Sequence, residues 1–163
     1  MSFKDNELKT RRLAWETMKK AKSHNRRLND VMAEILKNAH VNEYDRRFIT
    51  EIVQGTVRMR GRLDWEISKV FNGDMADLRE DFKILLQMGL YQIRYLNSVP
   101  DYAAVSTTVH LAKNIHNNLG GLTNALLRTL LTLEEFSKPD EHTPLPTMAS
   151  FLSHPEWLIS KWI

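Results

Sequence analysis

The sequence contains no cysteine, and this absence restricts it more than any other feature. Without a thiol the chain forms no disulfide, offers no thiolate to a metal ion and has no cysteine nucleophile. Such a composition fits a reducing compartment. With 163 residues the chain can still bury a hydrophobic core without a covalent or metal staple. We therefore expect one domain with a short appendage.

Long apolar runs and strand-like patterns are also missing. No stretch offers the roughly 20 mostly apolar residues that a membrane-spanning helix needs, and no N-terminal run resembles a signal peptide. No segment shows the sustained alternation of apolar and polar residues that is typical of a half-buried strand. These absences predict an all-α, cytoplasmic protein with no membrane partner.

What the sequence does contain is a stretch, residues 81–100, around which the other elements are expected to pack. Its apolar side chains are Ile84, Leu85, Leu86, Met88, Leu90, Tyr91, Ile93, Tyr95 and Leu96. A helix that is apolar nearly all round must be covered on most sides by other elements. We therefore predict that this stretch is the central buried helix of a bundle.

Hydrophobic periodicity places the remaining helices of a bundle of six to seven helices. They are predicted near residues 7–23, 30–39, 43–60, 65–71, 102–116 and 122–136. Asn29 and Asp64 are predicted N-caps, and Gly61 is predicted to end the third helix. Tyr44 is expected to face inward. Gly55 is predicted to mark a close approach of two helices, because a mid-helix glycine costs about 1 kcal/mol relative to alanine.

The C-terminal part of the sequence has a different character. In the last bundle helix, Ala125 and Thr129 are expected on the buried face. The segment 137–149 is rich in proline and polar residues and reads as a linker. Ser153 and Glu156 have the spacing of a capping box, so a further helix is predicted to begin there. A helix start with apolar residues and nothing after it indicates a piece of a longer protein.

Charge is distributed unevenly along the chain. The formal net charge is only +3, but residues 1–30 hold nine Lys or Arg against four Asp or Glu. A basic N-terminal third suggests an anionic partner, nucleic acid first. A solvated helix surface has the same composition, and charge alone does not separate the two interpretations. The six histidines are scattered without the spacing of a metal site, so no metal is predicted.

Several phrases together resemble a known family. The order LQMGLYQIRYL, VP, AAV, VHLAK and LTNALLR resembles the NusB-like helical domain over most of residues 8–136. The later phrase LSHPEWL, followed by Lys161 and Trp162, is similar to bacterial small-subunit ribosomal RNA cytosine-5 methyltransferases of the Sun/Fmu (RsmB) type. In those proteins it leads from the NusB-like domain into the catalytic part. The resemblance implies that residues 1–136 form an RNA-binding domain and residues 137–163 a linker and the start of a connection.

The resemblance also implies a fold and a binding surface. The fold is an all-α NusB-like bundle in two packed sub-bundles around the central helix, and the RNA surface lies largely around the basic first helix. Carried onto this chain, together with the charge pattern, the candidate RNA-binding residues are Lys9, Arg11, Arg12, Lys19, Arg26, Arg27, Arg58 and Arg128. Arg58 and Arg128 have two interpretations, an RNA contact or a structural salt bridge, and we favour the second.

One departure from the family concerns Arg11. Its position on the apolar stripe of the first helix predicts that its stem packs on the core and that its charge needs an anionic partner. The family often has Asn-Glu where this chain has Ser106 and Thr107. If that glutamate is the usual partner of the inward arginine, the partner must come from elsewhere here.

The chain itself lacks the chemistry of methyl transfer. Methylation of cytosine carbon 5 requires a thiolate that adds to carbon 6, and there is no cysteine. The six glycines form no strand-to-helix loop for a methyl donor. S-adenosylmethionine is therefore implied only for a catalytic domain outside this chain.

Three functions follow from these observations. The first is an RNA-binding domain that docks ribosomal RNA for its own C-terminal catalytic domain. The second is a stand-alone NusB-type transcription antitermination factor that binds RNA and a ribosomal protein. The third is a structural module that positions the catalytic neighbour and barely touches RNA. The tail, residues 137–163, favours the first over the second.

Overall fold

The computed structural model describes residues 2–133, 136 and 138–162, and these residues form helices and connecting segments without a strand. The elements are α1 (Phe3–Ser23), α2 (Leu28–Ala39), α3 (Glu43–Arg58), α4 (Arg60–Val70), the short 3-10 helix η1 (Met75–Asp77), α5 (Glu80–Tyr95), α6 (Asp101–Ile115), α7 (Leu119–Thr132), α8 (Leu145–Leu152) and α9 (Glu156–Ile159). Among these helices none is long and apolar enough to cross a membrane.

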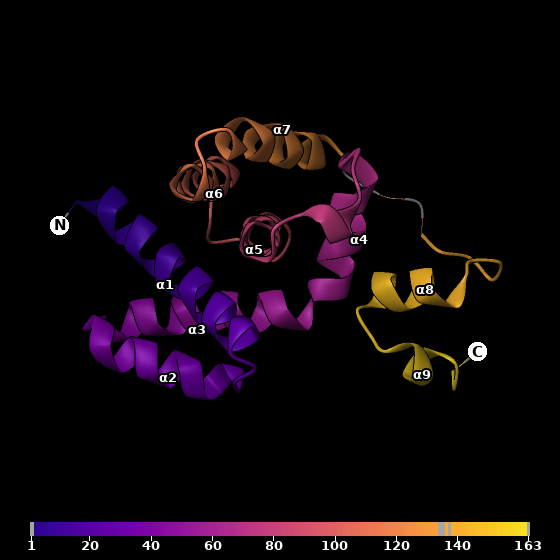
Figure 1. Ribbon diagram of the computed structural model, residues 1–163, viewed down its shortest axis with the longest axis horizontal. Helices are drawn as coiled ribbons and strands as arrows, with labels where there is room; N and C mark the ends of the chain where they lie inside the picture. Colours follow the sequence, from indigo (N-terminus) through magenta and orange to yellow (C-terminus); the bar gives the residue numbers. More distant parts are fainter. Residues whose placement is uncertain (1, 134–135, 137, 163) are drawn as a thin grey trace.

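Helix α5 is the centre of the molecule, as predicted. Figure 1 shows it end-on, with α1 and α3 on one side and α4, α6 and α7 on the others. Every residue from Ile84 to Gln92 is buried, including Gln87, which donates to the carboxylate of Asp64 at 2.6 Å. Burial all round explains why this stretch carries no polar face, since α5 contacts five other helices.

The other helices form two groups on either side of α5. Helices α1, α2 and α3 pack on one another, and α4, α6 and α7 pack around α5 (Figure 1). This arrangement confirms the predicted all-α bundle in two sub-bundles. Gly55 is confirmed as a close contact, because a methyl group there would lie 2.0 Å from Cζ of Tyr91.

Several predicted helix ends are wrong. Helix α1 begins four residues before Glu7, because the Ser2 hydroxyl accepts from the amide of Asp5 and the Asp5 carboxylate accepts from the amide of Ser2. Asn29 is not a cap, since α2 already begins at Leu28. Gly61 and Asp64 both lie inside α4, because the turn between α3 and α4 occurs at Met59 instead.

Some predicted inward faces are also wrong. Tyr44, in the first turn of α3, is 76% exposed and borders a shallow cleft that Thr10 and Arg11 of α1 also line. On α7, Ala125 and Thr129 are exposed whereas Thr123 and Leu127 are buried. The leucines of α7 cover about half of its circumference, a stripe so wide that its apolar pattern does not define which part of it is covered.

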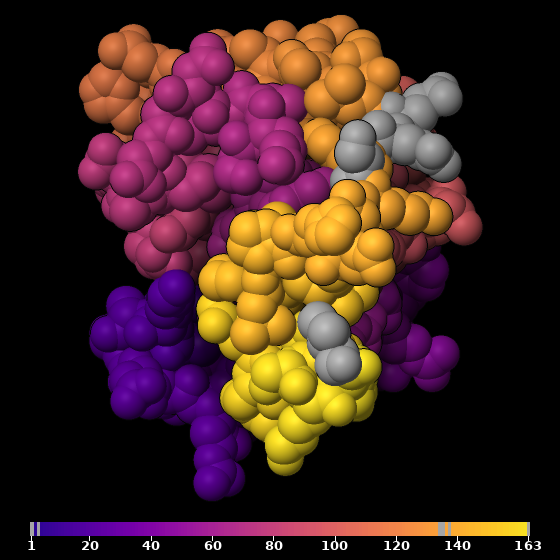
Figure 2. All heavy atoms as spheres, turned by 90° about the vertical axis from the view of Figure 1, so that its right-hand side faces the viewer, coloured from indigo at the N-terminus to yellow at the C-terminus, as the bar shows by residue number. Residues whose placement is uncertain are grey.

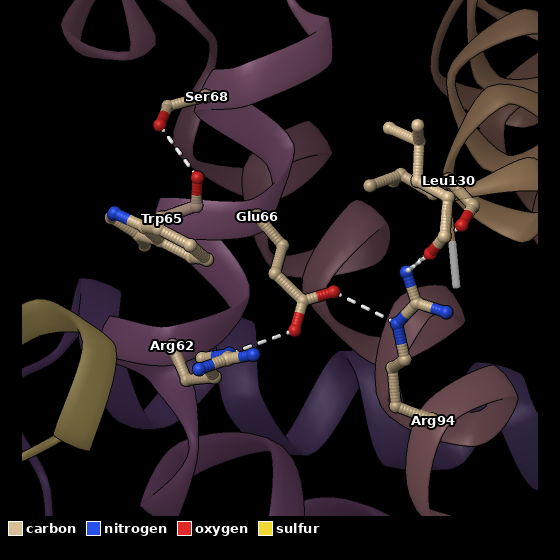
Figure 3. Close-up of polar contacts among 7 residues, drawn as sticks. Arg62, Trp65, Glu66, Ser68, Arg94 and Leu130 are labelled. Carbon is tan, nitrogen blue, oxygen red and sulfur yellow. Dashed lines mark hydrogen bonds and ion pairs between the residues drawn. The ribbon is translucent and has the colours of Figure 1, made fainter. Parts of the chain in front are cut away.

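A buried carboxylate joins α4, α5 and α7. The side chain of Glu66 is 3% exposed and accepts from Nε of Arg62 and Nε of Arg94, both at 2.8 Å (Figure 3). The guanidinium of Arg94 also donates to the carbonyls of Leu130 at 2.9 Å and Leu133 at 3.2 Å. Leu130 lies in the last turn of α7 and Leu133 is its C-cap, where backbone carbonyls lack the usual amide partner four residues on. One ion network therefore fixes the crossing of three helices.

The segment predicted as a linker contains a helix. Residues 145–152 form α8, which packs on α4 (Figures 1 and 2). The ring of Phe151 meets Trp65 edge-on at 5.2 Å, and the Arg62 guanidinium lies 3.9 Å from the centre of the Phe151 ring. Pro146 does not oppose this helix, because proline is tolerated in its first turn.

The predicted capping box at Ser153 is wrong, although a helix does begin after it. Ser153 has φ 54° and ends α8, and its hydroxyl donates to the carbonyl of Arg58 at 2.8 Å. Helix α9 has Pro155 as its N-cap and buries Ile159. Trp157 and Trp162 are 62% and 66% exposed. The predicted boundary at residues 136 and 137 falls partly outside the described residues.

Candidate nucleic-acid interface

One face of α1 carries three of the candidate RNA-binding residues. Lys9, Arg12 and Lys19 are separated by three and seven residues, a spacing that aligns side chains along one face of a helix. Arg12 is exposed, and within the described part of the chain its guanidinium has no carboxylate partner. The ammonium of Lys19 lies 3.6 Å from the centre of the Trp15 ring, so its position is fixed by a cation–π contact. Two acids, Asp5 and Glu16, also lie on this face.

The turn between α1 and α2 adds further positive charge. Asn25 in this turn has φ 48°, a left-handed conformation that asparagine tolerates better than most residues. Lys20 and Arg26 both form ion pairs with Glu34, and these partners hold the pKa of the Glu34 carboxyl below its usual value. Two cations on one carboxylate leave a net positive charge, and Arg27 beside them is exposed. The basic surface of α1 thus continues around the turn.

Arg11 lies on the opposite side of α1 and is only 5% exposed. Its Nε donates to Oε1 of Gln92 at 3.0 Å, and its guanidinium lies 4.5 Å from the centre of the Phe48 ring. Burial lowers the pKa of Arg11, although the charges of Glu7 and Asp45 oppose this shift. A buried guanidinium presents little surface to a phosphate. The RNA contact of Arg11 stays a prediction, and the packing role of its stem is what the geometry supports.

The anionic partner expected for Arg11 is therefore replaced by a neutral amide. Thr107 stands at the position where the family often has glutamate. Its hydroxyl does not replace that carboxylate as a partner of Arg11, because it donates to the carbonyl of Ala103 at 2.8 Å. The Gln92 amide also donates to the carbonyl of Met88, which orients its oxygen toward the guanidinium. Gln92 is the residue that sequence reasoning missed, and it is 81 positions from Arg11.

Arg58 and Arg128 lie on other elements. Neither forms an ion pair with a carboxylate among the described residues, so the salt-bridge interpretation is not supported for either. Arg58 ends α3 beside the hydroxyl of Tyr91, which donates to Oε1 of Glu51 at 2.7 Å. Arg128 on α7 donates to Oδ1 of Asn124 at 2.9 Å. Lys9, Arg12 and Lys19 thus lie on α1, Arg26 and Arg27 lie in the turn that follows it, and Arg58 and Arg128 lie on other helices.

The described residues offer no cluster of metal ligands. No group of three or more His, Asp or Glu side chains among them is placed to hold a metal ion. They also form no strand, so they provide no strand-to-helix turn of the kind that a methyl donor such as S-adenosylmethionine requires. What this surface can do is bind an anion through charge and hydrogen bonds.

Comparison with known proteins identifies the family. Residues 8–132 match the sequence profile of the NusB family, and this match covers most of the chain. The chain belongs to the NusB family, which confirms both the resemblance and the fold.

Its curated relatives narrow the assignment. The chain is 29% identical over 153 residues to a Bacillus subtilis protein named probable ribosomal RNA small subunit methyltransferase B, covering 93% of this chain and 34% of that protein. A Synechocystis protein of the same name is 39% identical over 118 residues, which is 71% of this chain and 26% of the relative. A putative methyltransferase of Mycobacterium tuberculosis is 31% identical over 155 residues, again 34% of its length. The chain therefore spans about a third of these relatives or less.

Proposed function

We propose that this chain is the RNA-binding module of a ribosomal RNA cytosine-5 methyltransferase and docks ribosomal RNA through the basic face of α1. The observation that carries the proposal is the alignment of Lys9, Arg12 and Lys19 on one face of α1. That face continues to Arg26 and Arg27 at the next turn. The names of the relatives, all of which are methyltransferases and two of which act on ribosomal RNA by name, support this choice of partner.

The expected mode of binding is contact with phosphates. Lysine and arginine side chains neutralise phosphate charge and release condensed counterions, so affinity falls as salt rises. Phosphate contacts from lysine and arginine form with any sequence, so the proposed mode of binding does not select a target base. The module therefore supplies affinity and orientation rather than choice of the target base.

Methyl transfer itself belongs, in this proposal, to the rest of a longer protein. The relatives are about three times as long as the matched part. S-adenosylmethionine and the thiolate nucleophile would lie in that remainder. The exposed side chains of Trp157 and Trp162 support a contact between α9 and the catalytic part, since large apolar side chains of this kind are enriched at interfaces. The proposed place of work is the cytoplasm, where ribosomal RNA is made in bacteria.

A ribosomal protein remains a proposed additional partner, because the NusB resemblance implies one. The α1 face does not require it. If a ribosomal protein is needed, the isolated chain will bind RNA weakly and the addition of that protein will strengthen binding. Binding of equal strength without it would remove this partner from the proposal.

The test measures binding of the chain to a fluorescein-labelled fragment of small-subunit ribosomal RNA by fluorescence anisotropy. Affinity should fall between 50 and 200 mM salt, with a log–log slope of about −0.7 to −0.9 for each phosphate contact. The double variant Arg12→Glu, Lys19→Glu should abolish binding while the circular dichroism of the helices is unchanged. An affinity that is flat with salt would overturn the phosphate-contact proposal.

A charge-matched control separates the α1 face from net charge. Lys37→Glu with Arg60→Glu makes the same change in net charge on α2 and α4, at two exposed positions. This control should keep most of the affinity. Equal loss in both double variants would show that only net charge matters and would contradict an α1 site.

A further inference from the structure

A second basic surface lies between α6 and α7 and is separate from the α1 face. It is a cleft of about 450 Å³, here called the α6–α7 cleft. Its polar lining comes from Tyr102, Ser106, His110 and Lys113 on α6 and from Asn124 and Arg128 on α7. Its floor is apolar and comes from Val105, Val109 and Leu131.

The lining of this cleft contains cations and no carboxylate. Lys113 and Arg128 are charged, and His110 adds a ring that accepts or donates hydrogen bonds. The groove between α1 and α5 differs, because Glu16, Glu80 and Asp81 stand among its lysines. Within the described residues, the α6–α7 cleft therefore favours an anion more strongly than that larger groove does.

Both cations are held at the α7 side of the cleft. The bond from Nε of Arg128 to Asn124 leaves the two terminal nitrogens of the guanidinium without another partner among the described residues. The stem of Lys113 lies flat on Gly120, where an added methyl group would be 2.7 Å from its Cγ and Cε. Gly120 thus lets the lysine stem pack closely on the start of α7.

The aromatic ring of Tyr102 stands at the end of the cleft away from Lys113. Tyr102 is 78% exposed. An isolated exposed tyrosine needs no explanation, but this ring borders an apolar floor and two fixed cations. The distance along α6 from Tyr102 to Lys113 is about 16 Å, from the helical rise of 1.5 Å per residue. A ring followed by cations over such a length is the arrangement that proteins use for single-stranded nucleic acid.

We propose that the α6–α7 cleft binds a short segment of single-stranded RNA, with one base stacked on Tyr102 and the following phosphates on Arg128 and Lys113. This proposal deepens the proposed function, on which it rests, by naming the form of RNA that a second surface takes. A duplex is excluded from this role, because its bases are stacked inside the helix and none is available to Tyr102.

The experiment uses a fluorescein-labelled oligouridylate of 12 nucleotides and, as the duplex probe, an RNA hairpin whose strands are joined by a non-nucleotide linker. Tyr102→Ala should weaken oligouridylate binding roughly 5- to 150-fold, the range for loss of one stacked base. Tyr102→Phe keeps the ring and should bind like the unaltered chain. Arg128→Ala should reduce the salt slope by about 1, because one phosphate contact is lost.

Tyr44→Ala is the matched control, since Tyr44 is equally exposed on α3. It should leave oligouridylate affinity unchanged, and none of the tyrosine variants should alter hairpin binding. A second readout is ultraviolet cross-linking of a 5-iodouridine oligomer, which should attach to the peptide that contains Tyr102. Both exposed tyrosine variants should keep the melting temperature of the unaltered chain.

The outcomes separate this proposal from the function of α1. If Tyr102→Ala binds oligouridylate normally and no cross-link reaches its peptide, the cleft proposal fails while the α1 face stands. If the Arg12→Glu, Lys19→Glu variant still binds the ribosomal RNA fragment but Tyr102→Ala loses oligouridylate, the α1 site fails and the cleft stands. A chain that binds neither probe overturns both.

Discussion

Two glycine-to-alanine substitutions should change stability in opposite directions. Both glycines lie inside helices and have ordinary helical backbones, since none of the described glycines has positive φ. Alanine is favoured over glycine in a helix by about 1 kcal/mol. Propensity alone therefore predicts the same gain at Gly55 and at Gly121.

The surroundings of the two glycines differ. At Gly121 an added Cβ meets no atom within 4 Å, so Gly121→Ala should stabilise the chain by the full propensity term. At Gly55 the added Cβ lies 2.0 Å from Cζ and from the hydroxyl oxygen of Tyr91. Tyr91 is 2% exposed, so its ring cannot move into solvent without moving α5 against α3.

The cost at Gly55 has two parts. Overpacking a filled core costs about 1 to 3 kcal/mol. Displacing the ring also breaks the hydrogen bond from the Tyr91 hydroxyl to Glu51, and hydrogen bonds to charged groups contribute about 1.5 to 3 kcal/mol. Against these losses stands the helix term of about 1 kcal/mol. We expect Gly55→Ala to lower the free energy of unfolding by about 1.5 to 5 kcal/mol in sum.

Urea unfolding followed by circular dichroism measures both variants. The midpoint should move down for Gly55→Ala and up for Gly121→Ala, with the slope m unchanged in each. In a Tyr91→Phe background the cost of Gly55→Ala should fall, because no hydroxyl bond is left to break. A Gly55→Ala variant as stable as the unaltered chain would refute the close approach of α3 and α5.

Two further predictions concern buried polar groups. Glu66→Gln removes the charge that pairs with Arg62 and Arg94, whose side chains are about one-fifth exposed. It should destabilise the chain by about 3 kcal/mol in thermal unfolding. The exposed control Glu141→Gln should change nothing, and equal stability of the two variants would contradict the network. Burial and, after it, the Glu51 carboxylate raise the pKa of Tyr91 to about 12. The folded state therefore keeps this proton to higher pH than the unfolded state, so the free energy of unfolding should decline as pH rises from about 10 to 12. The Tyr91→Phe variant should show a flatter decline over that window if the reasoning holds.

The central helix and the glycine contact followed from the sequence because both are encoded locally. An apolar stretch without a polar face has one physical solution in water, and Gly55 in the middle of a helix has a cost that needs a reason. The face of α7 was not predictable in the same way. Its leucines form a stripe about half the circumference wide, so the packing of α6 and α5 decides which part is buried, and that information is not local.

Helix α8 in the C-terminal segment did not follow from the sequence, for a different reason. Proline and polar residues between 137 and 149 are typical of a linker, yet α8 forms because Phe151 and Ala149 find an apolar surface on α4. A short helix of eight residues has little stability alone. Its existence depends on Trp65 and Arg62, which lie far away in the sequence, so tertiary packing overrides composition here.

The sequence predicted which arginine of α1 is buried but not which residue it contacts. The stripe on α1 predicted that Arg11 faces inward and Arg12 outward, which the burial of the two residues confirms. The partner of Arg11 was not predictable, because Gln92 belongs to the central helix and is neutral. Tyr102 was detectable in principle, since it lies off the apolar side of α6, but only the antiparallel packing of α7 brings Arg128 toward it.

The local density of arginine in the sequence is a poor guide to where this chain binds an anion. In the arginine-rich stretch, residues 45–62, three of the five arginines are engaged, since Arg46 and Arg47 lie near Glu43 and Arg62 pairs with buried Glu66. A paired cation gains little by turning to a phosphate, because it must first give up its carboxylate. Among the described residues, Arg12 and Arg128 are cations on helix faces without such a partner. Each therefore marks a proposed RNA surface, one on α1 for phosphates and one in the α6–α7 cleft for a single strand.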